Sequence, residues 1–321
     1  VRAAMALPPR KADSVFVQAS VRARQLQLSR SQVQTYVAER FRVRSDELVF
    51  LWAILAECIN CTWVPRIWPE FEVPVDVLLL VINVVGAALC GLGTRAEALG
   101  LPASLVGAFK GGFVASFTSF CGATEHAGSL HAKDHLAHLG FPYLIASLVL
   151  GPLAYYAGAV APEWVVPKEV SEFGGVTRVD PVLKGVLVAV IAASLGWEIV
   201  YGTAAELLAG IAMVIGAVTL GDWLGVAVER APLPGVIPNW GTPAANATAG
   251  ALLFLAKVLV PGESGLLLGK FCSTFVGCVS AFGAFSEDVA QNWLEDRKGL
   301  AVRVWVINFV VGAAAVLALA M

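Results

Sequence analysis

Charged side chains are scarce in this chain. Asp, Glu, Lys and Arg together make up 14% of its 321 residues, whereas 58% of the residues are hydrophobic. Soluble domains carry about a quarter charged residues, so this composition excludes a soluble globular protein. The net charge of −2 says little about partners, because the positions of the charges matter more than their sum.

Histidine is also rare, and its four copies are confined to one short segment: His126, His131, His135 and His138. Some of their spacings suit metal ligands on one helix face. A metal-dependent membrane protein that uses the His126–His138 loop is therefore one alternative, beside the simpler interpretation of a solvated loop. The six cysteines all fall inside apolar segments, where a thiol behaves as a small hydrophobic group.

Apolar stretches long enough to cross a bilayer as helices recur along the whole chain. We expect nine spans, at about 48–65, 75–94, 103–124, 139–160, 181–199, 204–227, 241–260, 264–286 and 301–320. The sequence therefore predicts an all-α polytopic membrane protein.

Basic residues predict the orientation of these spans. The first 46 residues contain nine Lys or Arg, and Lys and Arg concentrate on the cytoplasmic side of a membrane. With this arm inside, further inner basic residues are Arg95, Lys168, Arg178, Arg230, Arg297, Lys298 and Arg303, against Arg66 and Lys133 outside. We expect a cytoplasmic N-terminus and a C-terminus outside, in the plasma membrane.

Two parts of the chain repeat one pattern. Asn83 is followed after 37 residues by Phe120 in GGFVASFTSFCGA, and Asn246 is followed after 36 residues by Phe282 in TFVGCVSAFGAF. Two four-helix repeats, separated by an odd number of spans, must lie in opposite orientations, and inverted repeats commonly enclose a transport path. The predicted divisions are a basic cytoplasmic arm (1–46), a first repeat (47–161), a loop with a linking helix (162–203) and a second repeat (204–321).

The passages GTPAAN (241–246) and FGAFSED (282–288) resemble the signature passages of the fluoride channel and exporter family. The resemblance covers nearly the whole chain from about residue 48 and is strongest in the second repeat. Members with two fused copies and a linking helix are the eukaryotic form. The resemblance implies a fluoride-selective passive channel that exports fluoride, with fluoride and the lipid bilayer as partners, no nucleic acid, no enzymatic activity, and a self-sufficient monomer.

Fluoride is small and tightly hydrated, so a pathway must replace its water with hydrogen-bond donors. Amide and hydroxyl groups donate, and a phenylalanine ring has a positive edge. The expected fluoride pore residues are Phe120, Phe285, Phe282, Asn83, Asn246, Tyr143 and Ser147. The resemblance also implies a structural central sodium ion, held by backbone carbonyls where both third helices break: Ala115, Thr118, Gly277 and Ser280.

The two repeats are unequal, which predicts a single working pore. The second phenylalanine of the family is Phe285 in the second repeat, but Ala123 stands at that position in the first. In the family, each pore combines the first phenylalanine of one repeat with the second phenylalanine of the other. The pore that contains Phe120 and Phe285 is then complete, whereas the pore that contains Phe282 and Ala123 lacks one ring. The fourth helix of the first repeat offers Tyr143 and Ser147 as a polar track, and the second offers Val304 and Asn308.

One further alternative is a proton- or sodium-coupled exchanger of another small solute. Glu57 and Asp222 are acids inside apolar segments, and acids within a membrane are usually functional or paired. Lys110 and Lys270 lie early in the two third helices, where a cation could collect anions or could extend its charge to the interface.

Overall fold

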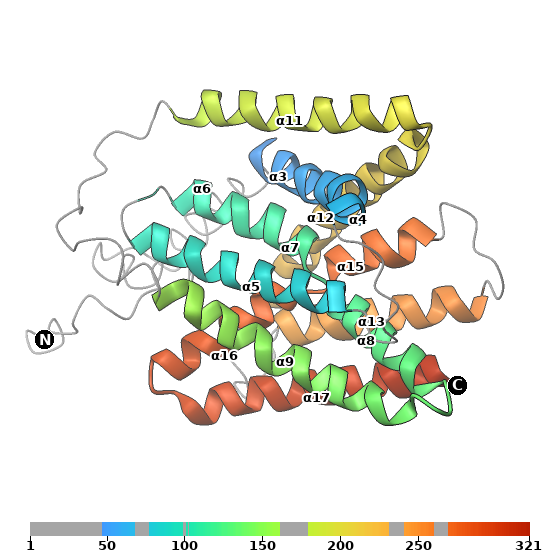
Figure 1. Cartoon of the computed structure of the whole chain (residues 1–321). Coiled ribbons are helices and arrows are strands. Elements are labelled where there is room, and N and C mark those ends of the chain that lie inside the picture. Colours follow the sequence, from blue (N-terminus) through green and yellow to red (C-terminus); the bar gives the residue numbers. More distant parts are fainter. Residues whose placement is uncertain are drawn as a thin grey trace, which may run out of the picture. The chain divides into compact units, whose positions relative to one another are not determined.

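The computed structural model describes residues 47–67, 77–98, 101, 103–160, 179–230, 241–259 and 269–321. The basic arm 1–46 lies outside these residues. Glu47–Met321 form one compact unit, and every regular element among its described residues is a helix (Figure 1). The prediction of an all-α protein is confirmed.

The first repeat begins with one helical segment, α3 (Glu47–Cys58), η3 (Ile59–Trp63) and α4 (Val64–Ile67). Its other elements are α5 (Val77–Ala98), α6 (Ala103–Ala108), η4 (Phe109–Val114), α7 (Ala115–Phe117), α8 (Phe120–His131) and α9 (Ala137–Val160). The linking helix is α11 (Val179–Tyr201). The second repeat contains α12 (Ala204–Arg230), α13 (Gly241–Leu259), η6 (Phe271–Phe275), α15 (Val276–Val279), α16 (Phe282–Leu294) and α17 (Lys298–Ala320).

Six of these helical segments are long and apolar enough to cross a membrane: Val77–Glu97, Leu105–His131, Ala137–Val160, Val182–Tyr201, Gly241–Leu259 and Lys298–Ala320. Each agrees with an expected span to within a few residues, except that the segment beginning at Leu105 continues to His131, beyond the expected end at about 124. The other three expected spans are also helical, in α3–α4, in α12 and in η6–α16. The chain is therefore a multi-pass membrane protein.

The two repeats exchange partners. The helix α8 packs on α9 of its own repeat and on α17 of the other, and α16 packs likewise on α17 and α9. Trp305 Nε1 donates to the carbonyl of Leu148 at 3.0 Å, and Leu144 contacts Gly312 further along α17. Residue numbers increase along α17 in the direction in which they decrease along α9. The two fourth helices are therefore antiparallel, as inverted repeats require.

Both third helices break where the sequence predicts it. Thr118 and Ser119 are extended, with φ/ψ of −103/150 and −141/115. In the second repeat Ser280 is extended, at −74/135, and Ala281 leaves the helical region, at −107/62. The first half of each third helix ends at the break, and the second half begins after it.

The linking helix α11 lies against α3 and α12. Trp63 Nε1 donates to Ser194 Oγ at 3.0 Å, and Arg66 pairs with Glu198 at 2.8 Å. Its most apolar window is only 17% buried, the smallest share among the six candidate spans. An outward apolar face of this kind fits a helix that contacts lipid on most of its surface.

The inverted arrangement predicts that equivalent loops lie on opposite sides of the membrane. Lys133 lies between α8 and α9, Lys298 lies at the start of α17, and both are exposed. Lys133→Cys and Lys298→Cys, each in the full chain, should react with a membrane-impermeant maleimide from opposite faces of sealed vesicles. The unsubstituted chain gives the background from its six free cysteines. Labelling of both positions from one face would contradict the inversion.

Candidate functional site

A pair of asparagines stabilises the two helix breaks. Asn83 of α5 accepts from the N–H of Ser119 at 2.8 Å and donates to the carbonyl of Ser119 at 3.0 Å. Asn246 of α13 accepts from the N–H of Ala281 at 2.7 Å. Both asparagines are fully buried. Each amide replaces helical hydrogen bonds that the break removes, which is the requirement for non-helical backbone at membrane depth.

The two breaks touch each other directly. Ser280 Oγ accepts from the N–H of Phe120 at 3.0 Å and from that of Cys121 at 3.3 Å. A hydroxyl of the second repeat therefore caps the N-terminus of α8 in the first. A Cβ on Gly277 would lie 3.2 Å from Ser119 Oγ, so a small residue is needed where α7 and α15 meet.

The backbone at the breaks fits the carbonyl donor set expected for sodium. In a continuous helix the carbonyls of Ala115 and Gly277 would bond the N–H groups of Ser119 and Ala281, which bond Asn83 and Asn246 instead. The carbonyl of Thr118 likewise loses the N–H of Gly122, which donates to Ser119 Oγ at 2.7 Å.

One carbonyl of this set has a partner already. The carbonyl of Gly277 accepts from the hydroxyl of Ser280 at 2.6 Å. A carbonyl oxygen has a second lone pair, so this bond leaves it able to bind a cation.

The ring of Phe282 and the hydroxyl of Ser286 lie together on the face of α9. A Cβ on Gly151 would come within 2.7 Å of Phe282 Cζ and 2.6 Å of Ser286 Oγ. Ser286 is fully buried, and its Oγ makes no hydrogen bond among the described residues. The ring of Phe285 is 6.1 Å from that of Phe282, at 57°. The structure thus places an unpartnered hydroxyl beside a ring edge.

Phe120 occupies the equivalent place on the other fourth helix. Its Cζ would lie 3.2 Å from a Cβ on Gly312 of α17, beside Leu144. Phe120 is 1% exposed. The first phenylalanine of each repeat therefore packs on the fourth helix of the other repeat.

The polar track expected on α9 is buried and continues further than the sequence analysis indicated. Tyr143, Ser147, Gly151 and Tyr155 follow one another every fourth residue and are all buried. Ser147 donates to the carbonyl of Tyr143 at 3.0 Å. The ring of Tyr143 contacts His126 at 4.7 Å. From Gly151 onward this track lies against α16, on the side of Phe282 and not of Phe120.

The equivalent positions on α17 are less polar: Val304, Asn308, Gly312 and Val316, all buried. The single amide among them is engaged, because Asn308 accepts from Asn246 at 2.7 Å and donates to the carbonyl of Val304 at 2.9 Å. The seam between α8 and α17 therefore offers fewer free donors than the seam between α9 and α16.

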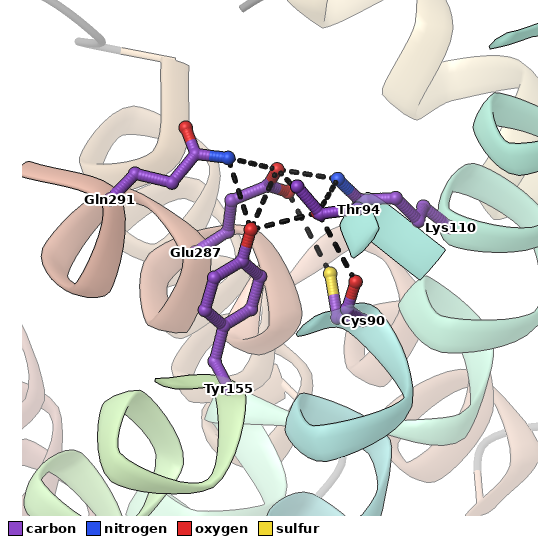
Figure 2. Close-up of polar contacts among 6 residues, drawn as sticks. All are labelled: Cys90, Thr94, Lys110, Tyr155, Glu287 and Gln291. Atoms are coloured by element: carbon purple, nitrogen blue, oxygen red, sulfur yellow. Dashed lines mark hydrogen bonds and ion pairs between the residues drawn. The ribbon is translucent and has the colours of Figure 1, made fainter. Parts of the chain in front are cut away.

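A charged cluster lies at the end of the α9 track (Figure 2). It contains Cys90 and Thr94 of α5, Lys110 of η4, Tyr155 of α9, and Glu287 and Gln291 of α16. Lys110 forms an ion pair with Glu287, whose side chains are 18% and 21% exposed. Of these six residues, the sequence pointed only to Lys110, which was expected, like Lys270, to collect anions or to extend its charge to the interface. The four-residue spacing, extended from Ser147, would have found Tyr155.

Glu125, which holds the position of Glu287 in the other repeat, has a different partner. Glu125 of α8 pairs with Lys257 of α13 at 2.7 Å, and these side chains are 34% and 44% exposed. Lys257 stands where the first repeat has Thr94, and Val316 stands where it has Tyr155. No counterpart of the hydroxyl pair exists on this side among the described residues.

Glu57, the acid suggested for a coupled exchanger, has partners that the sequence did not reveal. It accepts from Cys61 at 2.9 Å and from Thr274 at 3.2 Å. Lys270 lies 3.6 Å from its carboxylate. Glu57 therefore ties α3 to η6 as a paired acid. The side chain of Asp222 lies outside the part of the chain that the structure describes.

The histidine loop does not assemble a metal centre in the described residues, which include all four histidines and hold no cluster of three candidate ligands. His131 Nδ1 lies 3.2 Å from the carbonyl of Ala137, and its ring contacts Phe141 at 5.3 Å. These contacts fix the loop between α8 and α9.

Comparison with protein-family models, with curated proteins and with solved structures finds no match.

The two asparagines predict a stability effect that a simple packing residue would not give. Asn83→Ala leaves the N–H of Ser119 without its partner and leaves its carbonyl with the N–H of Ala123 alone, at 3.4 Å. We therefore expect it to lower the free energy of unfolding by about 1–3 kcal/mol. Asn60→Ala is the matched control, because Asn60 makes only a 3.5 Å contact with the carbonyl of Ser116. Denaturant unfolding in detergent measures both. Equal losses would show that Asn83 does not support the break.

Proposed function

We propose that this protein is a fluoride-selective passive channel that exports fluoride across a membrane. The observation that carries the proposal is the unpartnered hydroxyl of Ser286, buried against the ring of Phe282 where Gly151 makes room for both. A donor left free within a membrane segment is costly, and an anion passing at this point would satisfy it.

The surroundings suit fluoride better than a larger or more weakly hydrated anion. Hydroxyls and ring edges can replace the water of a small anion without a fixed charge that would hold it. Conduction requires sites that bind weakly enough to release the ion. The α9 track supplies Tyr143, Ser147 and Tyr155 on one buried line of the helix, with Gly151 between the last two. Lys110 lies at one end, where it can attract anions.

We assign conduction to one pathway, the seam between α9 and α16. The sequence pattern predicts Phe120 with Phe285 as the working pair, with Phe282 in the incomplete pore. The part of the track from Gly151 to Tyr155, however, lies on the side of Phe282, and the seam of Phe120 has Val304 and Val316 in place of two tyrosines. Our proposal therefore keeps the single pore and gives it to Phe282.

The proposal includes a central sodium ion with a structural role. The backbone carbonyls of Ala115, Thr118, Gly277 and Ser280 would hold it at the two breaks. The positive charge would also offset the partial negative charge at the ends of the two half-helices. We further propose that the chain acts as a monomer in the plasma membrane, without enzymatic activity, with its N-terminus in the cytoplasm and its C-terminus outside.

Substitution of single phenylalanines tests the assignment of the pore. Phe282→Ile nearly keeps the volume but removes the ring edge, and the loss of about 1.4 kcal/mol of contact energy slows passage by about tenfold. Fluoride efflux from liposomes, measured without a proton gradient, should fall in Phe282→Ile and stay near the unsubstituted rate in Phe120→Ile. The opposite result would give the pore to Phe120 and Phe285. No fluoride-selective efflux from the unsubstituted protein would end the proposal.

Gly151 offers a second test of the same seam. A methyl group at Gly151 would enter the space shared by Phe282 and Ser286, so Gly151→Ala should block efflux while the purified protein stays monodisperse. Gly196→Ala is the matched control, since a Cβ at Gly196 in α11 meets nothing within 4 Å. Normal efflux in folded Gly151→Ala would place the pathway elsewhere.

A further inference from the structure

Four donor groups surround one oxygen atom of Glu287. Its Oε1 accepts from the ammonium of Lys110 and from Gln291 Nε2 at 2.9 Å, and the hydroxyls of Tyr155 and Thr94 lie 3.4 and 3.5 Å from it (Figure 2). The two hydroxyls also bond each other, which uses one of their two protons, so one of them at a time donates to Oε1. The other oxygen accepts from the thiol of Cys90 at 3.6 Å. Ordinary side-chain carboxylates share their donors between both oxygens, so this convergence on one atom is unusual.

The donors are held in place by bonds among themselves. Lys110 Nζ donates to Thr94 Oγ1 at 2.9 Å, and Thr94 Oγ1 lies 2.8 Å from the hydroxyl of Tyr155. Gln291 Nε2 donates to the same hydroxyl at 3.0 Å. The cage therefore has its own framework, built from α5, η4, α9 and α16, and does not depend on the carboxylate for its shape.

The charge of this cage requires an anion. Lys110 is the cation, and Glu287 is the carboxylate that neutralises it. A buried ammonium without a negative partner is strongly unfavourable. Three donors at a time, one of them charged, converge on the place of a single small acceptor atom, and an oxygen of a tethered carboxylate fills it.

We propose that Lys110, Thr94, Tyr155 and Gln291 form a binding site for a small inorganic anion, which Glu287 occupies as a tethered competitor. When the carboxylate withdraws toward the solvent that already reaches 21% of its side chain, a free anion takes the place of Oε1. The site then controls entry to the α9 track from this end. The role in entry rests on the proposed channel function, whereas the anion site itself does not.

The opposite seam, between α8 and α17, provides the contrast. Glu125, at the position equivalent to Glu287, pairs with Lys257 at a more exposed place, and the neighbouring Val316 cannot donate. Removal of the Glu125 carboxylate leaves a solvated lysine without a cage. Glu125→Ala is therefore a matched control for Glu287→Ala.

Anion-dependent stability of the full-length protein in detergent tests the site. Glu287→Ala should have a lowered Tm in sodium gluconate, whose anion is too large for the cage. Fluoride or formate at the same ionic strength should raise its Tm by a few degrees in a saturable way, since a ligand that binds only the folded state stabilises it. The unsubstituted protein and Glu125→Ala should respond little. Equal responses of all three proteins, or none in Glu287→Ala, would overturn the proposal.

Two additions separate this outcome from others. If Glu287→Ala does not fold, Glu287→Gln takes its place, because it keeps the side-chain volume while removing the charge that competes for Lys110. It should bind the same anions with a smaller rise in Tm, and no rise would count against the site.

Liposome efflux distinguishes the anion site from the channel function. Anion-dependent stability without efflux would support the site and contradict the channel. Efflux without anion-dependent stability would support the channel and contradict the site.

Discussion

The hydrogen bonds that Asn83 and Asn246 make to the broken third helices are the interactions on which the rest of the structure depends. A bilayer offers no water to an open helix end, so each break needs an internal partner for its backbone. Asn83 provides a donor and an acceptor to one residue, Ser119. Asn246 provides an acceptor to Ala281. Without these bonds a continuous helix would be the favoured form of both segments.

The breaks determine how the repeats join. Beyond each break, the second half of the third helix packs on the fourth helices of both repeats. This arrangement brings Phe282 onto Gly151 and Phe120 onto Gly312. It also allows Ser280 to cap the N-terminus of α8. The two repeats thus share one interior, and Phe120, Phe282 and Ser280 lie where they meet.

Much of this fold could be predicted from the sequence, because hydropathy reports span length and equal spacing reports repetition. The helices and the linking helix agree with this expectation, and both breaks lie where the resemblance to the fluoride channels implies them. The partner of each phenylalanine could not be predicted, since the choice between the two seams depends on the direction in which α8 and α16 leave the breaks. Ion pairs such as Lys110 with Glu287 join residues 177 positions apart, and periodicity carries no information about them.

Lys110 and Lys270 show how the inverted repeats become different in function. Both lie early in the third helices but two positions out of register, because Lys110 corresponds to Cys272 and Lys270 to Ala108. Lys110 is caged with Glu287, while Lys270 contacts Glu57 and donates to Cys61 at 2.9 Å. Lys270 is therefore drawn toward α3, away from Glu125, whose charge Lys257 neutralises instead. Each lysine still has an acid, as burial in a membrane demands. The acid beside Lys270 accepts from the hydroxyl of Thr274 and the thiol of Cys61, whereas two hydroxyls and the amide of Gln291 surround Lys110 and its acid.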